Sequence, residues 1–421
     1  MVLALGACGD DLPAASDAAV ADAAAADAAV DAAPVDAARI DAAPIDARPV
    51  DAAADAAALD PHVDPAFGQG GATRLDAPGG VGAIINGAGG DLVLCGPSTD
   101  PDDPMFGGQP WLGRIDAAGA GPAQVWTVAA AGTLEGCTDV VTLADGRLAL
   151  VTSGFAGGRL QIRTAAGALV VERVVPPAQR LFRLAAAPDG GLWAVGSEGL
   201  RRYDAALEPV AAFGAGGLVG FAGGYDLVAH GATVDATRLT VSVKAERRLR
   251  RFVGATGAVD LGFGVDGTVV IPTPPGWPVG GSIRDLIALP AGGVTVATTM
   301  PAPEPGAFVG IVAVDGAGVV GPQVPGGAVA VGSGALDPAG RVFWPSSYGM
   351  LPGLDPFLAF ARTTITTPEI STIVRPPPQC GQCRYATAGA VWAGGMVVAY
   401  TVRDTSVPNH PFSTWLMRFQ E

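Results

Sequence analysis

The sequence is poor in charged, aromatic and basic residues. Only 15% of its 421 residues are charged, 6% are aromatic, and Lys244 is its one lysine. With 25 basic against 40 acidic residues the formal net charge is -15, whereas a nucleic-acid-binding protein needs a basic surface. No apolar run reaches the length of about 18 residues that a membrane-spanning helix needs. The sequence therefore predicts neither a nucleic-acid partner nor a membrane-spanning helix.

Histidine is also scarce, which limits acid–base and metal chemistry. None of the 3 histidines, His62, His230 and His410, lies in an HExxH metal motif or in the Gly-x-Ser-x-Gly turn of a hydrolase. His230 precedes a predicted hairpin, where other units have alanine or proline, so we expect a structural role for it. His410 lies in a long predicted loop and is the better candidate for binding.

Glycine and proline are plentiful instead. The 61 glycines and 36 prolines make up about 23% of the chain, roughly twice their usual share, which argues against a mainly helical protein. Short apolar runs flank seven turns spaced about 51 residues apart, and such two-residue turns need positive φ. These turns are Gly89-Gly90, Asp145-Gly146, Asp189-Gly190, Asp235-Ala236, Gly292-Gly293, Ala339-Gly340 and Gly394-Gly395.

A second repeated feature is the pattern Phe-Gly-x-x-Gly. It occurs at 67–71, 213–217 and 263–267. These segments resemble the bacterial delta-sixty repeat, and the resemblance implies units that stack as propeller blades. Together with the hairpins it predicts an all-β fold, a single β-propeller of seven four-stranded blades, with six or eight blades as alternatives.

The two ends of the repeat region, 61–421, are predicted to complete one blade together. Ala72–Leu75 reads as an outer strand, whereas the chain stops at Glu421 after a third strand, so pairing the two closes the ring. Long Pro-rich connections should all leave one face, which is the predicted binding face. They cover residues 97–110, 272–283, 299–307, 345–356, 374–384 and 403–412.

The first residues are predicted to be a targeting signal followed by a tether. Leu5-Gly6-Ala7-Cys8 resembles the lipobox of bacterial lipoproteins, which implies cleavage before Cys8 and lipidation of its thiol. Residues 1–8 lack the basic start of a signal peptide, so we expect the natural start upstream. Gly9 replaces the inner-membrane retention aspartate of some enteric lipoproteins, which favours the outer membrane, facing the periplasm or the cell exterior.

Residues 9–60 consist largely of alanine, aspartate and proline. From Asp17 to Asp60 an aspartate recurs every four or five residues, and prolines interrupt any helix. Such a composition cannot bury enough apolar surface to fold, so we expect a disordered, extended tether. Residues 1–60 contain 12 aspartates and 2 arginines, so they hold about two thirds of the net charge.

The other four cysteines fall on the predicted binding face. After export, disulfides are the default, and Cys95–Cys137 with Cys380–Cys383 is the favoured pairing among three. The CxxC of Cys380 and Cys383 is alternatively a redox centre or half of a zinc site.

Loop residues supply the remaining candidates. Asp100, Asp102 and Asp103 offer oxygen ligands for calcium, or form a solvated acidic loop. Trp277 and Tyr348 offer aromatic surfaces for a sugar or peptide, or pack over blade edges. Arginines recur in phase near the ends of third strands, which predicts a role in the repeat structure; they are Arg114, Arg163, Arg202, Arg251 and Arg418.

Two functions follow from these observations. The favoured one is a monomeric, lipid-anchored propeller that binds an envelope protein or polysaccharide without catalysis and without a cofactor. The alternative is a propeller enzyme, either a metal-dependent lactonase-like hydrolase or a quinoprotein-like dehydrogenase. That alternative requires several carboxylates or histidines to converge at the channel mouth, and the sequence shows no concentrated supply of them.

Overall fold

A computed structural model describes most of the repeat region. The described residues are 63–69, 71–75, 80–97, 109–120, 124–128, 135–154, 156–243, 246–273, 281–300, 308–325, 333–348, 357–363, 368–374, 383–393, 395–404 and 412–419. They all belong to one compact unit, Ala56–Glu421. Cys8 and the predicted tether lie outside the described residues. In the described part of the chain, no helix combines the length and the apolar character needed to cross a membrane.

The described residues form strands almost throughout, with one short 3-10 helix, Pro177–Gln179. The first three sheets contain β2 (Ala83–Asn86), β3 (Leu92–Pro97), β4 (Pro110–Ile115) and β5 (Gln124–Thr127); β6 (Glu135–Thr142), β7 (Leu148–Gly154), β8 (Gly157–Arg163) and β9 (Leu169–Val175); β10 (Leu181–Ala186), β11 (Leu192–Gly196), β12 (Gly199–Tyr203) and β13 (Leu218–Gly220). The next three contain β14 (Gly224–His230), β15 (Arg238–Val243), β16 (Arg248–Val253) and β17 (Thr268–Val270); β18 (Ser282–Ala288), β19 (Val294–Met300), β20 (Phe308–Val314) and β21 (Val324–Pro325); β22 (Ala335–Leu336), β23 (Val342–Tyr348), β24 (Phe357–Thr363) and β25 (Pro368–Val374). The last sheet joins β1 (Ala72–Leu75) to β26 (Cys383–Trp392), β27 (Met396–Asp404) and β28 (Phe412–Phe419).

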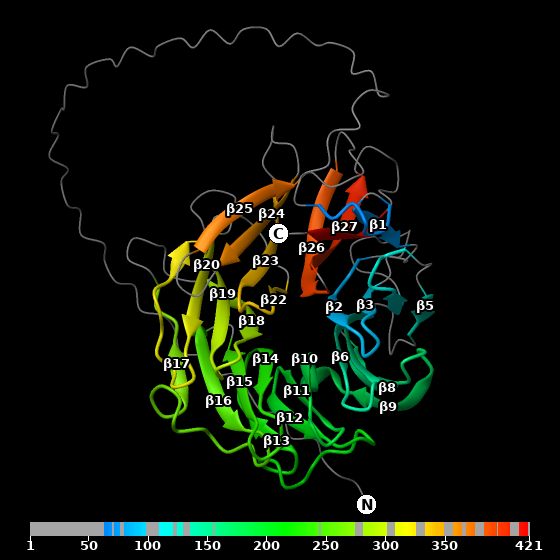
Figure 1. Ribbon diagram of the computed structural model, residues 1–421. Helices are drawn as coiled ribbons and strands as arrows, with labels where there is room; N and C mark the ends of the chain where they lie inside the picture. Colours follow the sequence, from blue (N-terminus) through cyan, green and yellow to red (C-terminus); the bar gives the residue numbers. More distant parts are fainter. Residues whose placement is uncertain are drawn as a thin grey trace, which may run out of the picture. The chain divides into compact units, whose positions relative to one another are not determined.

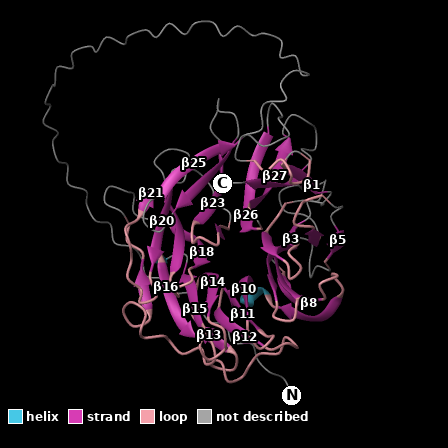
Figure 2. Cartoon of the chain, in the orientation of Figure 1, coloured by secondary structure: helices cyan, strands magenta, loops and turns pink. Residues whose placement is uncertain are grey.

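The sheets are arranged as the blades of a propeller. Each of six sheets has four consecutive strands in chain order, all antiparallel, and a seventh four-stranded sheet unites the two ends of the described chain. The first strands contact one another from sheet to sheet, as β6 does β10 and β10 does β14. Figure 1 shows these first strands innermost, and Figure 2 shows that strands and loops make up nearly all of the fold. The predicted all-β propeller with four-stranded blades is confirmed.

Blade interfaces form the core. Each buried apolar cluster draws residues from two neighbouring sheets, as Leu184 and Tyr203 pack with Leu160. Five of the predicted hairpin turns contain a glycine with φ between 78° and 82°. Glycine is favoured at these positions because residues with a Cβ adopt positive φ only with an unfavourable conformational energy. These glycines are Gly90, Gly146, Gly190, Gly292 and Gly340.

The Phe-Gly segments clamp neighbouring blades together. Phe67, Phe213 and Phe263 are buried, and the glycine after each donates its N–H across 2.8 Å to a carbonyl in the next blade. The acceptors are the carbonyls of Ala118, Thr256 and Ala317. The Phe-Gly segment forms a turn that precedes the outer strand, and this turn reaches the neighbouring blade.

The phased arginines serve the same purpose. Arg251 donates Nε to Asp260 at 2.8 Å and lies over the ring of Phe263, 4.3 Å from its centroid. Each of Arg114, Arg202, Arg251 and Arg418 also donates Nη1 to a carbonyl of the following blade, at 3.0 to 3.5 Å. These contacts agree with the predicted role of the arginines in the repeat structure.

The closing blade forms as predicted. β1 pairs antiparallel with β28, with Ala72 opposite Met417. Asp64 reinforces the closure, since its backbone N–H donates to the Arg418 carbonyl at 2.9 Å and its Oδ2 accepts from Arg418 Nε at 2.6 Å.

Candidate functional site

The propeller has two different ends. Connections from second to third strands, and from each blade to the next, leave the end that we call the loop-bearing end; the tight hairpins lie at the hairpin end. The predicted long connections belong to the loop-bearing end, and their central residues lie outside the described residues. Residues 345–348, predicted to lie in a loop, instead form the end of β23 because they pair with β24.

The inner strands share a bulge close to the loop-bearing end. In β6, β10, β14 and β18 the pairing register shifts by one residue within the first four positions. The extra residues are Thr138, Phe182, Tyr225 and Arg284, and β26 has a similar shift before Gly389. A bulge of this kind re-aims the side chains next to it.

The residue after each of the first four bulges is ionisable, and it ties its blade to another. Asp139 accepts the Leu184 N–H at 2.7 Å, Asp226 accepts the Leu286 N–H at 2.6 Å, and Asp285 accepts the Gly334 N–H at 2.8 Å. Each acceptor and its donor belong to neighbouring blades. Asp285 also accepts from Trp344 Nε1 at 2.8 Å.

Arg183 takes the corresponding place in β10. It donates Nη1 to the Thr138 carbonyl at 2.9 Å, and its Nε lies 3.4 Å from Asp226 Oδ1. The fold therefore places one guanidinium among three carboxylates that are 9% exposed or less, Asp139, Asp226 and Asp285.

Burial sets the protonation of this cluster. Desolvation raises the pKa of Asp139 to about 6, against which the Arg183 charge acts. The pKa of Asp285 rises to about 8, through desolvation and then through the Asp226 charge. Asp226 also has a raised pKa for reasons of burial, moderated by Arg183. Burial therefore favours the protonated form of Asp285 beside Asp226.

The extra residues of the bulges are more accessible than the three aspartates of the charged cluster. Thr138, Phe182 and Tyr225 are half-buried, whereas Arg284 is exposed and donates Nε to Thr299 Oγ1 at 3.2 Å. The rings of Phe182 and Tyr225 lie 6.1 Å apart with planes inclined by 40°. Arg180, just before β10, has its guanidinium 6.0 Å from the Phe182 centroid. We call Arg180, Phe182, Tyr225 and Arg284 the channel mouth.

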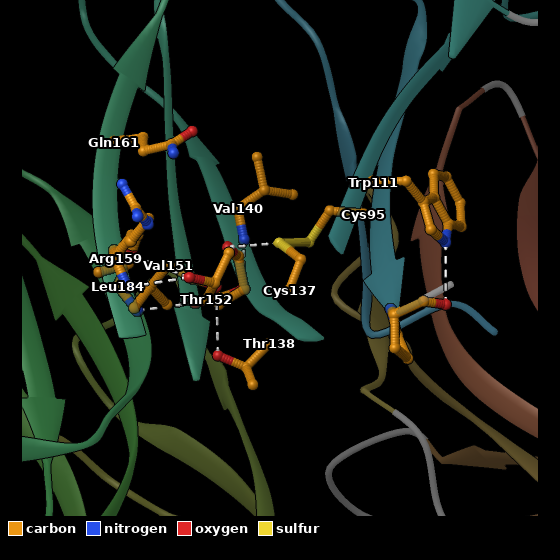
Figure 3. Close-up of a disulfide and its surroundings, with 12 residues drawn as sticks. Cys95, Trp111, Cys137, Thr138, Val140, Val151, Thr152, Arg159, Gln161 and Leu184 are labelled. Atoms are coloured by element: carbon orange, nitrogen blue, oxygen red, sulfur yellow. Dashed lines mark hydrogen bonds between the residues drawn. A yellow bond between two sulfur atoms is a disulfide. The ribbon is translucent and has the colours of Figure 1, made fainter. Parts of the chain in front are cut away.

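The predicted disulfide Cys95–Cys137 is confirmed and lies at the same end. It joins β3 to β6 across a blade interface, with the two Cα atoms 5.6 Å apart. Figure 3 shows it between Trp111 on one side and Thr138 and Val140 on the other. Trp111 Nε1 donates to the carbonyls of Gly80 and Pro97, both at 3.1 Å, which fixes the start of β2 beside the bridge.

The other predicted site residues are not brought together. Several of these residues lie outside the described residues, and for them the predictions remain untested predictions. They are Cys380, Trp277, His410 and the calcium candidates Asp100, Asp102 and Asp103. Cys383 begins β26 opposite Asp404, and Tyr348 ends β23 opposite Phe357, in strands rather than in loops. His230 ends β14 and has a pKa lowered by burial and by Arg251, which agrees with a structural role.

A hollow of about 440 Å³ lies at the hairpin end, lined by residues that include Asn86, Leu336, Asp337 and Val391. The Asp337 carboxylate forms an ion pair with Arg341. The lining of this hollow is more polar than apolar, but its carboxylate is already paired with an arginine.

The charged cluster was not predicted from the sequence. A signal was present, because Thr138-Asp139, Phe182-Arg183, Tyr225-Asp226 and Arg284-Asp285 each precede an aliphatic residue at the same phase of the repeat. The sequence had shown no concentration of carboxylates, and this expectation is corrected. Each blade contributes one aspartate from a distant segment, and the ring brings Asp139, Asp226 and Asp285 to the same end of the propeller. Within the described chain, no group of three acidic, histidine or cysteine side chains is arranged to hold a metal ion.

Comparison with known proteins identifies the architecture. No protein-family model and no curated protein matches the chain. A streptogramin B lyase structure is similar with 9% identity and a TM-score of 0.52, covering 83% of this chain and 97% of the lyase. A GH74 enzyme of Niastella koreensis has 13% identity and a TM-score of 0.51, covering 79% of this chain and 54% of the enzyme. The chain is a β-propeller. At these identities the similarity concerns the fold alone.

Proposed function

We propose that this propeller is a non-catalytic binding module that acts as a monomer and recognises a protein or polysaccharide of the cell envelope at its loop-bearing end. Lipidation of Cys8 would attach it to the outer membrane, facing the periplasm or the exterior. No cofactor is needed for this activity.

One observation carries the proposal. The carboxylates nearest the channel mouth already accept backbone N–H groups of neighbouring blades, so their oxygens hold the ring together rather than meet a substrate. The accessible side chains beside them are aromatic rings and guanidinium groups, which anchor ligands, and among these the Tyr225 phenol alone can exchange a proton at ordinary pH. The geometry therefore favours binding over turnover.

A co-sedimentation experiment tests the proposal. Residues 61–421 would be incubated with the insoluble envelope fraction of the source organism, beside Tyr225→Ala and a matched hairpin-end variant, Arg147→Gln. We expect wild type and Arg147→Gln to sediment, Tyr225→Ala to stay in solution, and the envelope fraction to remain chemically unchanged. Equal sedimentation of all three proteins would contradict binding at the channel mouth.

Membrane attachment needs a separate measurement. Cells that produce the full chain with its natural start would be labelled with radioactive palmitate, beside a Cys8→Ala variant. We expect labelled protein only when Cys8 is present. Equal labelling of the variant would refute the lipoprotein part of the proposal.

A hydrolase is the second candidate, because Asp285 has a pKa of about 8 and contacts a second carboxyl group, Asp226. Such proton-sharing pairs supply the general acid of many hydrolases. Metal analysis of the purified protein and a screen of ester and lactone substrates test this candidate. Turnover abolished by Asp285→Asn, or stoichiometric calcium or zinc, would favour it over plain binding.

A further inference from the structure

The inner strands carry charges of opposite sign at different depths of the loop-bearing end. In β6, β14 and β18 the carboxylates of Glu135, Asp139, Asp226 and Asp285 are all buried. Glu135 bonds to Thr152, and the three aspartates bond to neighbouring blades. The accessible charges of these described strands are therefore positive.

Two arginines provide this positive charge. Arg284 in β18 is exposed, and Arg180 at the start of β10 is half-buried. The four residues of the channel mouth include two arginines and no acidic residue, whereas the chain as a whole has a net charge of -15. Guanidinium groups bind carboxylates through paired, charge-assisted hydrogen bonds.

Two aromatic rings lie between these arginines along the order of the blades. Phe182 and Tyr225 come from the successive strands β10 and β14, and their inclined rings form a half-exposed pair. Arg180 lies next to Phe182, and Arg284 occupies the same bulge position one blade beyond Tyr225. A ligand that suits the mouth must bring a rigid apolar face and a negative charge close to each other.

We propose that the channel mouth binds a carboxylated sugar, the uronate unit of an acidic polysaccharide. The C–H face of the sugar ring lies against Phe182 and Tyr225, and its carboxylate pairs with Arg284. This inference rests on the proposed binding function and specifies its ligand class.

The rigidity of the ligand distinguishes a uronate from an acidic peptide. A uronate carries its carboxylate on the sugar ring itself, so one unit contacts both the aromatic pair and an arginine. Its binding therefore loses less conformational entropy than that of an acid on a flexible side chain. An aspartate or glutamate side chain brings the charge without a rigid apolar face. We therefore expect a preference for the sugar.

Isothermal titration calorimetry tests the proposal with defined probes. Residues 61–421 would be titrated with an oligogalacturonate, with the neutral galacto-oligosaccharide of equal length, and with an oligoglutamate peptide. We expect the oligogalacturonate to bind at least about tenfold more tightly than either of the others, because one charge-assisted pairing contributes that much. Raising NaCl to about 0.5 M should weaken its binding.

Single substitutions assign the contacts. Arg284→Gln should weaken oligogalacturonate binding about tenfold and abolish most of its salt dependence, and Tyr225→Ala should weaken it to a similar extent. Arg147→Gln, which removes the same charge at the hairpin end, should bind as wild type does. Thermal melting of each variant verifies that the propeller is intact.

The outcomes separate this inference from the proposed function. No binding of the oligogalacturonate, or equally tight binding of the oligoglutamate, overturns the uronate assignment. Equal binding of the neutral sugar that still depends on Tyr225 overturns the assignment but retains a binding function at the mouth. Binding that is unaffected by both Tyr225→Ala and Arg284→Gln overturns both.

Discussion

A bulged inner strand uses two consecutive residues for two purposes. In β14, Tyr225 is the extra residue and stays accessible, whereas Asp226 is buried and bonds the next blade. In β10 the two purposes are less clearly divided, because Phe182 and Arg183 are both half-buried and Arg183 bonds the Thr138 carbonyl of the preceding blade. In the proposed binding function, stability and recognition are therefore separated at neighbouring positions of β14, and variants of one need not disturb the other.

The first residue-scale prediction concerns pH. Asp285 has a folded pKa of about 8 against an ordinary value of 3.8, so the folded state holds a proton that the unfolded state has lost. Its contribution to the free energy of unfolding therefore falls as pH rises from about 4 to 8. Asp285→Asn cannot ionise, so between pH 6 and 8 its stability should fall less steeply than that of wild type in urea titrations. Asp145→Asn, in an exposed hairpin, should follow wild type, and identical slopes for all three proteins would contradict the prediction.

The second prediction concerns the blade-to-blade disulfide. Cys95 and Cys137 are 42 residues apart, and closing a loop of that length stabilises a fold by about 4 kcal/mol in the chain-entropy treatment. The double variant Cys95→Ala/Cys137→Ala should lose a comparable free energy of unfolding in denaturant titrations. The matched variant Cys380→Ala/Cys383→Ala should lose much less, because its predicted bridge closes a far shorter loop. Equal losses would show that loop length is not the cause.

At the scale of elements, β9 is an unusually apolar outer strand. Its backbone pairs on one side with β8, and Leu169, Val170 and Val174 are 50%, 49% and 62% exposed. Long apolar edges promote aggregation unless charges interrupt them. Glu172 and Arg173 lie at the centre of β9 and provide such charges, Glu172 paired with Arg159 and Arg173 with Glu208.

Removing these two charges should promote self-association. The variant Glu172→Val/Arg173→Val leaves an uninterrupted apolar edge, so light scattering should rise during incubation under native conditions. The variant Glu246→Val/Arg248→Val removes a similar exposed pair beside β17, an outer strand of three residues, and it should remain in solution because so short a strand offers little backbone for pairing. Equal behaviour of the two variants would show that the β9 charges do not protect the edge.

Element-scale features were the most accessible to sequence reasoning. Hairpin glycines such as Gly146, and the Phe-Gly segments at Phe67, Phe213 and Phe263, each satisfy a local requirement that leaves a trace in the sequence. The charged cluster was missed because each blade contributes one residue. Asp139, Arg183, Asp226 and Asp285 become neighbours only once the ring has formed.

At the scale of the whole molecule, stability depends on closure. Deleting residues 61–80 removes β1, Asp64 and Phe67, and the loss of a buried phenylalanine alone costs about 3–5 kcal/mol. The melting temperature should therefore fall sharply, whereas deleting 9–58 should leave it unchanged. Equal melting of wild type and the 61–80 deletion would contradict the closure.

The closing blade also imposes an order in time. β1 is among the first strands to be synthesised, and its partner β28 is the last, with Asp64 and Arg418 lying 354 residues apart. Contacts so distant along the chain form slowly, because a long loop must close before they can form. The six blades of consecutive strands can assemble as the chain emerges, whereas β1 has to wait for the C-terminal strand. The ring can therefore close only after β28 has been synthesised and is free to pair with β1.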